Sequence, residues 1–259
     1  MKKVYLIGIG PGDPDYLTVQ AINTLKKVDV FFLLEKGNEK GYEEFVKVRK
    51  EILERYLKEG TYRVVSTNIP ERRKSGKYKE EVKRWRQRKA EVILELIKDK
   101  MADGENAAFL IWGDPALYDG QIEILTSILK EGRVDFEYEV IPGITSIQVL
   151  TAKHKIPLNR IGESIVITTG RRLKEYSPDE VTNTVVLLDN YSNFKHLKDT
   201  DLEIYWGGYL GSEDEILLSG KLKDVLEELK RIRAEAKKKK GWLMDTYILR
   251  QPAGEEDDE

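Results

Sequence analysis

Short apolar runs of strand length alternate with longer charged stretches over the first 142 residues. The short runs are almost unbroken, as in strands that are buried on both faces, while the longer stretches repeat their apolar residues at helical spacing. This alternation predicts an α/β lobe with a mostly parallel sheet. The strands are expected at residues 4–9, 28–34, 62–65, 107–112 and 136–141, and the helices at residues 18–27, 43–58, 80–98 and 121–131.

Pro142-Gly143 interrupts the alternation, and we place a domain boundary there. In the second lobe, residues 143–253, strands outnumber helices, so a mixed sheet is expected. The expected fold is therefore two α/β lobes with a ligand cleft between them. The acidic tail at residues 254–259 is expected to be disordered. The second set of strands is expected at residues 164–168, 184–188, 203–205, 215–218 and 242–249, with helices at residues 146–154 and 222–238.

The composition excludes several kinds of site. There is no cysteine, which rules out disulfides, thiolate metal sites and cysteine nucleophiles. The only histidines are His154 and His196, so no metal centre is expected. Lys and Arg (44) nearly balance Asp and Glu (46), which argues against a nucleic-acid partner. The longest apolar runs are too short to cross a membrane and no signal segment is evident, so we expect a cytoplasmic protein.

A glycine-rich loop, Gly-Ile-Gly-Pro-Gly-Asp at residues 8–13, follows the first expected strand. Such a turn suggests nucleotide binding, because glycines let the backbone approach a ligand closely. Asp13 stands where the dinucleotide-binding pattern has its third glycine, and Pro11 removes a backbone donor that a phosphate would use. A neutral or cationic ligand therefore fits better than a phosphate. A tight turn without any ligand is the alternative.

Two further turns follow apolar strands in the same lobe. Gly-Asp-Pro at residues 113–115 follows the strand at 107–112, and Pro-Gly-Ile-Thr-Ser at residues 142–146 follows the strand at 136–141. Because parallel strands end at one edge of their sheet, the three turns can converge on one crevice.

With these three motifs in this order, the chain resembles the tetrapyrrole methylase family over nearly its whole length. The resemblance implies a two-lobed homodimer that binds S-adenosylmethionine between its lobes and acts on a tetrapyrrole. This donor carries a sulfonium and no phosphate, in agreement with the argument from Pro11. Asp189 and Leu210 are expected to flank the adenine. The cofactor-binding residues implied by the resemblance are Gly10, Pro11, Gly113, Asp114, Leu117, Thr145, Ser146, Asp189 and Leu210.

Within the family, several segments resemble the branch that methylates C1 of precorrin-5 and releases acetate, giving precorrin-6A. Sirohaem-forming relatives usually have Gly-Arg where this chain has Asp119-Gly120. The alternatives are another tetrapyrrole or precorrin methylase, a non-catalytic relative that binds S-adenosylmethionine, and an RNA methylase. The segments that carry this finer resemblance are residues 29–37, 112–119, 156–163, 168–172 and 205–211.

Methyl transfer from a sulfonium to an electron-rich carbon requires aligned reactants and excluded water more than a side-chain nucleophile. Loss of an acetyl group requires water and proton transfer as well. Asp119 is the candidate that orients or activates this water, and Tyr118 is the candidate partner of the acetyl oxygen. Asp119 could equally cap the helix expected at residues 121–131. Both readings of Asp119 stay open.

The substrate implied by the resemblance bears many carboxylates, so cations are expected near it. Residues 71–89 contain ten Lys or Arg against three Glu, although a solvated helix face anchored by Val82 and Trp85 is the favoured reading. Arg171 and Arg172 follow an expected strand, where guanidinium groups can bind carboxylates through paired hydrogen bonds. We therefore expect Arg171 and Arg172 to contact the substrate.

Overall fold

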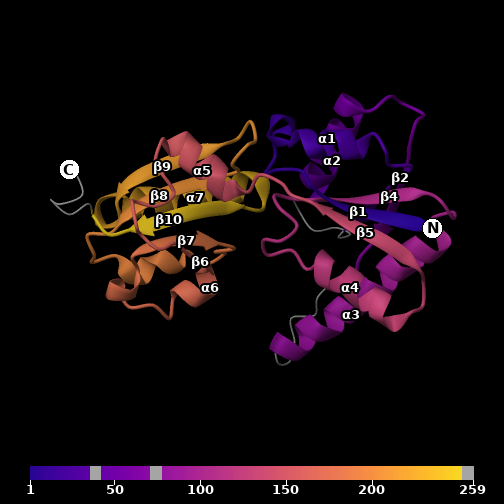
Figure 1. The fold of residues 1–259 in the computed structure, drawn as a ribbon. Helices are drawn as coiled ribbons and strands as arrows, with labels where there is room; N and C mark the ends of the chain where they lie inside the picture. The colour runs from indigo at the N-terminus through magenta and orange to yellow at the C-terminus, as the bar shows by residue number, and fades with distance from the viewer. Residues whose placement is uncertain (36–41, 71–77, 253–259) are drawn as a thin grey trace. The chain divides into compact units, whose positions relative to one another are not determined.

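The computed structural model describes residues 1–35, 42–70 and 78–252. The chain divides into two compact units, Met1–Thr145 and Ser146–Glu259. The division falls just after the boundary expected at Pro142-Gly143, because Gly143 lies against loops of the first unit. The acidic tail expected at residues 254–259 lies outside the described residues. Each unit contains one five-stranded sheet (Figure 1).

The sheet of the first unit has the strand order β3-β2-β4-β1-β5, and all of its strand pairs are parallel. The predicted parallel sheet is therefore confirmed. β1 is an inner strand and pairs with β4 on one side and with the edge strand β5 on the other. The strands are β1 (Lys2–Gly8), β2 (Val30–Glu35), β3 (Arg63–Asn68), β4 (Asn106–Ile111) and β5 (Phe136–Ile141).

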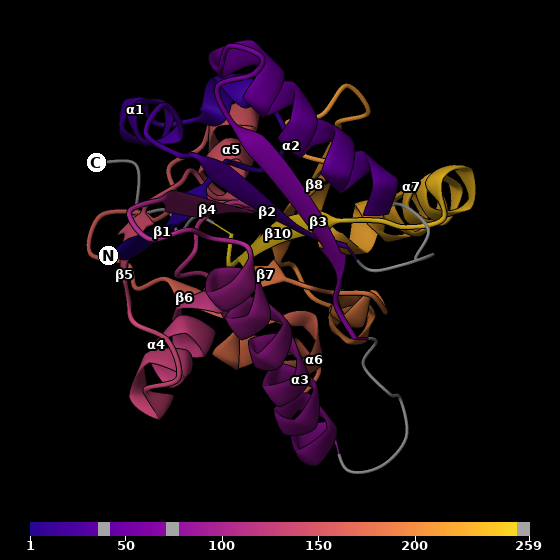
Figure 2. The same ribbon diagram turned by 90° about the vertical axis from the view of Figure 1, so that its right-hand side faces the viewer.

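Four helices cover the two faces of this sheet: α1 (Val19–Leu25) and α2 (Tyr42–Tyr56) on one side, α3 (Tyr78–Asp99) and α4 (Gln121–Glu131) on the other (Figures 1 and 2). Along β1, Val4 and Leu6 pack with the α3 and α4 side chains, while Tyr5 and Ile7 pack with those of α1 and α2. Successive strand residues point to opposite faces, so covering both faces requires apolar residues throughout. Each such side chain contributes about 1.5–3 kcal/mol on burial.

The sheet of the second unit has the order β6-β7-β10-β8-β9 and is mixed, as expected. Only β6 and β7 are parallel; the other three pairs are antiparallel. The helix α7 (Leu222–Lys240) and the short helix α6 (Gly170–Leu173) contribute to its buried core, and α5 (Ser146–His154) contacts β8, β9 and β10. The strands are β6 (Val166–Thr169), β7 (Asn183–Leu187), β8 (Glu203–Gly208), β9 (Ile216–Lys221) and β10 (Asp245–Arg250).

A buried polar cluster ties α7 to the second sheet. The Tyr247 hydroxyl donates to Asp189 Oδ2 at 2.7 Å, and Arg233 Nη2 donates to the Asp189 carbonyl at 2.6 Å. Arg233 also pairs with Asp245, which accepts from Trp206 Nε1 at 2.6 Å. Burial raises the pKa of Tyr247 well above its ordinary value and lowers the pKa of Arg233. Buried charges of this kind persist only when they are paired and hydrogen-bonded.

Among the residues that the structure describes, no helix has the length and hydropathy that a bilayer crossing requires.

Candidate active site

Two of the three glycine loops are joined through their main chains. The Gly113 N–H donates to the Gly10 carbonyl at 2.9 Å, and the Gly10 N–H donates to the Gly113 carbonyl at 3.3 Å, which forms a short antiparallel bridge. Both residues have left-handed backbones, with φ of +77° at Gly10 and +66° at Gly113. Glycine adopts this conformation without a steric penalty, so the bridge depends on both glycines.

The third loop lies directly against the other two. A Cβ at Gly143 would lie 2.2 Å from the Gly113 carbonyl oxygen, and a Cβ at Gly8 would lie 2.6 Å from the Gly143 nitrogen. A Cβ at Gly113 would lie 3.9 Å from Cα of Thr145. The loops that follow β1, β4 and β5 therefore converge at one edge of the sheet, which confirms the convergence predicted from the sequence.

Asp114 holds this arrangement with its carboxylate. Its Oδ2 accepts from the Gly143 N–H at 2.9 Å, and its Oδ1 accepts from the Ala116 N–H at 2.8 Å. Its carbonyl accepts from the Leu117 N–H at 3.2 Å. One ionised side chain thus both shapes its own turn and ties that turn to the loop after β5, through hydrogen bonds of the stronger, charge-assisted kind.

The structure brings together Gly10, Gly113, Asp114 and Thr145 of the predicted cofactor residues, with Pro11 buried beside Gly10 and Leu117 half-buried. Ser146 begins the second unit, where its hydroxyl hydrogen-bonds that of Thr246 at 2.8 Å. Binding of a cofactor by these residues stays a prediction.

Asp189 and Leu210, predicted to flank an adenine, are both buried in the second unit. The Asp189 carboxylate accepts from the Tyr247 hydroxyl and from Asn193, whose N–H and side-chain amide donate at 2.7 and 2.8 Å. A Cβ at Gly207 would lie 2.6 Å from the Leu210 side chain. Both side chains are packed within the unit, and their contact with an adenine stays a prediction.

Tyr118 and Asp119, the predicted catalytic residues, end the Gly-Asp-Pro loop. Tyr118 has φ of +55° and an exposed side chain. A left-handed backbone is costly for a bulky residue, and such strain is concentrated at functional sites. Asp119 Oδ1 accepts from the Gln121 N–H at 2.8 Å, at the first residue of α4. Asp119 thus hydrogen-bonds the first N–H of α4, but the N-cap position is Gly120, without a side-chain cap hydrogen bond, so the prediction that Asp119 is the N-cap is wrong. The catalytic role of Asp119 stays a prediction.

Arg171 and Arg172 lie in α6, a four-residue helix directly after β6 that the sequence pattern did not predict. Both are exposed, and Arg172 pairs with Glu175 at 3.2 Å. An exposed ion pair of this kind adds little to the stability of a protein. Their contact with substrate carboxylates stays a prediction.

The basic stretch at residues 71–89 is described only from residue 78 onward. On α3, Lys83, Arg84 and Arg86 are exposed, while Val82 and Trp85 are half-buried. This is the solvated helix face that the sequence favoured.

A cavity of about 220 Å³ lies beside the Gly-Asp-Pro loop and was not predicted. Trp112 and Asp119, at the two ends of that loop, line it together with Arg49 of α2, Lys89 of α3 and Gln121 of α4. One feature of the sequence could have indicated a polar site at this position. Lys89 lies between Trp85 and Ile93 at four-residue spacing, so a lysine interrupts the apolar stripe of α3. The rest of the lining is Phe32, Leu34, Ile69, Trp85, Phe109, Leu110 and Ile111.

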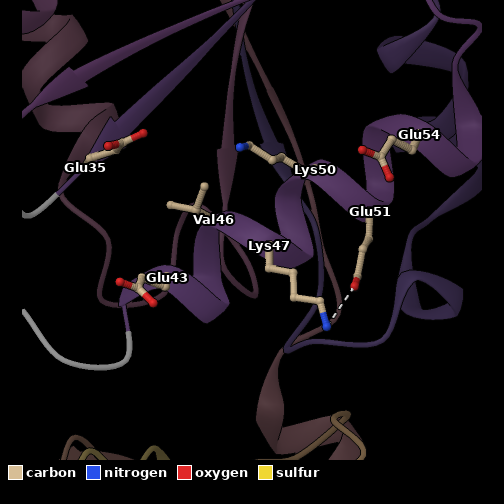
Figure 3. A pocket seen from close by; sticks show the side chains of 7 residues that line it. All are labelled: Glu35, Glu43, Val46, Lys47, Lys50, Glu51 and Glu54. Carbon is tan, nitrogen blue, oxygen red and sulfur yellow. Dashed lines mark ion pairs between the residues drawn. The ribbon is translucent and has the colours of Figure 1, made fainter.

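A larger, more open groove of about 580 Å³ runs along α2 (Figure 3). Lys47 and Glu51, one turn apart on α2, form an ion pair of 3.4 Å in it. The part of the chain that the structure describes contains no group of three His, Cys, Asp or Glu side chains placed to hold a metal ion. We assign no ligand to this groove. It is lined by Glu35, Glu43, Val46, Lys47, Lys50, Glu51 and Glu54.

Comparison with known proteins identifies the family. Residues 3–226 match the model of the Tetrapyrrole (Corrin/Porphyrin) Methylases. The chain is 44% identical to a precorrin-6A synthase [deacetylating] of Sinorhizobium sp., over 98% of this chain and 97% of that protein. A cobalamin synthesis related protein (CobF) of Corynebacterium diphtheriae has a similar structure, with a TM-score of 0.82 and 33% identity over 96% of this chain and 98% of that one.

A more distant structure shares the fold alone. It is a uroporphyrin-III C-methyl transferase of Thermus thermophilus in complex with S-adenyl homocysteine, with a TM-score of 0.55 and 21% identity over 96% of this chain and 97% of that one. The family model covers most of the sequence, and the first relative is similar over almost its full length. The chain therefore belongs to the tetrapyrrole (corrin/porphyrin) methylase family.

Proposed function

We propose that this protein is an S-adenosylmethionine-dependent C-methyltransferase of corrin biosynthesis. Its reaction is methyl transfer to C1 of precorrin-5 with hydrolytic loss of the extruded acetyl group as acetate, giving precorrin-6A. The observation that carries the proposal is the 44% identity, over 98% of this chain, to a precorrin-6A synthase [deacetylating]. The structural similarity to CobF of Corynebacterium diphtheriae supports the same branch of the family.

The three converging loops suit the methyl donor. Gly10 and Gly113 present main chain without side chains, and Pro11 has no N–H to offer a phosphate. S-adenosylmethionine contains a sulfonium and no phosphate, so a loop cluster carrying the anionic side chain of Asp114 fits its charge. We propose Gly10, Pro11, Gly113, Asp114, Leu117, Thr145 and Ser146 as the residues that hold it, with the main chain around Asp189 and Leu210 at the adenine.

The overall reaction consumes one molecule of the donor and one of water. The methyl group leaves the sulfonium as a carbon–carbon bond forms with C1 of the macrocycle. The oxygen of water bonds to the acetyl carbon, the bond from that carbon to the macrocycle breaks, and its electron pair stays on the macrocycle. The products are precorrin-6A, S-adenosylhomocysteine, acetate and released protons. Alignment and exclusion of water serve the methyl transfer, and proton transfer serves the hydrolysis.

We propose Asp119 as the group that orients or activates the water and Tyr118 as a hydrogen-bond donor to the acetyl oxygen. Arg171 and Arg172 are the proposed partners of substrate carboxylates. They are exposed and follow a strand end, and planar guanidinium groups bind carboxylates through paired hydrogen bonds. We further propose a cytoplasmic homodimer, as the resemblance of the sequence to the family implies.

The proposal is tested by incubating the purified protein with precorrin-5 and methyl-labelled S-adenosylmethionine, and by measuring product mass and free acetate. Equimolar label incorporation and acetate release are the expected result. A methylated product without acetate would place the protein in another branch of the family. Donor binding by calorimetry without any methyl transfer would indicate a non-catalytic relative.

A further inference from the structure

The side-chain amide of Gln121 contains an unusual buried acceptor. Gln121 is the first residue of α4 and is only 3% exposed. Its Oε1 has no hydrogen-bond partner among the residues that the structure describes. Buried acceptors are almost always paired, because leaving one unpaired sacrifices the hydrogen bonds that it made with water. An unpaired acceptor that persists in a folded protein therefore points to a group that binds there.

Gln121 lines the cavity beside the Gly-Asp-Pro loop, together with Asp119 and the mostly buried Lys89. Asp119 accepts from the Gln121 N–H through Oδ1 at 2.8 Å, which holds the two residues next to each other at the start of α4. Lys89 Nζ stands 5.7 Å from the centre of the Trp85 ring. The cavity volume of about 220 Å³ exceeds the ~30 Å³ share of one water molecule in the liquid several times. It has room for water and a small acyl group.

The cavity is lined by two side chains with acceptor oxygens, Gln121 and Asp119, and by one cation, Lys89, and this combination favours one kind of ligand. A substrate carboxylate could pair with Lys89, but it has no hydrogen to donate to Gln121 Oε1. A water molecule has two hydrogens, one for the amide oxygen and one for the carboxylate of Asp119. The lining therefore favours a water molecule, with the positive charge of Lys89 near any oxygen on which negative charge develops.

We propose that this cavity is where the acetyl group is hydrolysed: Gln121 and Asp119 hold the attacking water by accepting its two hydrogens, and Lys89 stabilises the acetyl oxygen. The inference rests on the proposed function. As the water oxygen bonds to the acetyl carbon, one proton passes to Asp119 and the carbonyl oxygen becomes negative beside Lys89. The bond to the macrocycle then breaks with its electron pair on the ring. The acetic acid formed and the protonated Asp119 each give one proton to the solvent, and the product leaves as acetate.

Gln121→Met is the main test, because methionine keeps the length of the side chain and removes the acceptor. The expected result is a kcat for acetate release lower by about 10²-fold, the scale of a proton-transfer arrangement. The affinity for S-adenosylmethionine and the KM for precorrin-5 should stay as in the unaltered protein. The unfolding temperature should be equal or higher, because an unpaired buried acceptor has been removed. Gln121→Glu keeps an oxygen acceptor and should restore the rate to within about tenfold of the original.

Gln87→Met makes the same chemical change at an exposed position of α3 and is the matched control; its kinetics should equal those of the unaltered protein. Acetate release at the original rate in Gln121→Met would overturn the inference. So would a raised KM with an unchanged kcat, which would indicate that the cavity anchors a carboxylate arm of the substrate.

Lys89→Met removes the cation that α3 contributes to the cavity. It tests the role of the cavity in acetyl hydrolysis even if Gln121→Met does not fold. A lower kcat with an unchanged KM supports the inference, and the reverse pattern overturns it. The unaltered protein separates this inference from the proposed function. If it yields neither acetate nor methylated product from precorrin-5, the proposed function fails. If it yields both, and the variants do so equally fast, only the role of the cavity is wrong.

Discussion

The Asp114 carboxylate accepts a hydrogen bond from the main-chain N–H of Gly143 at 2.9 Å, which joins the loop after β4 to the loop after β5. The two residues are 29 positions apart in the sequence. Because Gly113 also bridges to Gly10, the three loops at this edge of the sheet form one hydrogen-bonded unit. Changes at any of the three should therefore affect donor binding.

Replacement of Asp114 by Ala should weaken the binding of S-adenosylmethionine at least tenfold. It removes the acceptor of two main-chain donors, and hydrogen bonds to a charged group contribute about 1.5–3 kcal/mol each. Asp114→Asn keeps one carbonyl oxygen and should lose less stability. Calorimetric titration with the donor and urea unfolding measure the two effects. Unchanged donor affinity in Asp114→Ala would remove this loop from the proposed binding site.

Gly143→Ala should separate the loops. The added Cβ would lie 2.2 Å from the Gly113 carbonyl oxygen, so the main chain has to move. We expect a loss of about 1–3 kcal/mol in the free energy of unfolding, as for other overpacked sites, together with loss of donor binding. Gly104→Ala is the control, since φ there is +87° but no atom lies within 4 Å of the new Cβ. It should cost only the strain of the left-handed backbone, about 1–2 kcal/mol, and leave donor binding intact.

Asp119 is expected both to hold the start of α4 through the Gln121 N–H and to act as a catalytic group, and two variants separate these roles. Asp119→Asn retains an oxygen for the Gln121 N–H, so stability should stay within about 0.5 kcal/mol while acetate release slows by about 10²-fold. Asp119→Ala should slow acetate release equally and also lose the hydrogen bond from the Gln121 N–H, at a cost of about 1 kcal/mol. Thermal unfolding and an acetate assay on the same preparations provide the data. Unaltered turnover in both variants would leave the hydrogen bond to the Gln121 N–H as the whole role of Asp119.

The double variant Arg171→Ala and Arg172→Ala should raise the KM for precorrin-5 with little change in kcat. Both side chains are exposed on the short helix α6, so their removal should hardly affect folding. The KM of the unaltered protein should also rise with salt, because the proposed contacts are between opposite charges near the surface. Steady-state kinetics at two salt concentrations test both statements. A KM that responds to neither change would exclude these arginines from substrate binding.

Tyr247 should make the second unit sensitive to alkali. Burial, reinforced by the nearby Asp189, raises the pKa of its hydroxyl well above the ordinary value of 10.0. As the pH rises past 10, the unfolded chain releases this proton before the folded chain does. The contribution of Tyr247 is therefore complete below pH 10 and falls above it, by about 1.4 kcal/mol per pH unit.

Tyr247→Phe should remove this additional alkaline slope. At pH 7 it should cost about 1.5–3 kcal/mol, because the hydroxyl no longer donates to the Asp189 carboxylate. Urea unfolding of both proteins between pH 8 and 11 measures the slopes. Parallel pH dependences above pH 10 would contradict the assignment.

The sequence predicted the parallel sheet well because its strands are apolar on both faces, a pattern typical of parallel strands that helices cover on both sides. It predicted less well where glycines are involved. The strand expected to end at Tyr205 continues as β8 through Gly208. A Cβ at Gly208 would lie 2.6 Å from the Trp206 ring, so glycine at this position makes room for a buried side chain rather than ending the strand.

The sequence alone determined the two sheets and the convergence of the three glycine loops, because local apolar spacing and the position of glycines after parallel strands are enough to specify them. Only the tertiary structure decided that Asp189 is buried beneath α7 and that Gln121 and Lys89 border one cavity. Such neighbours come from different helices and strands. Their meeting depends on how those elements pack, and no local pattern of residues records it.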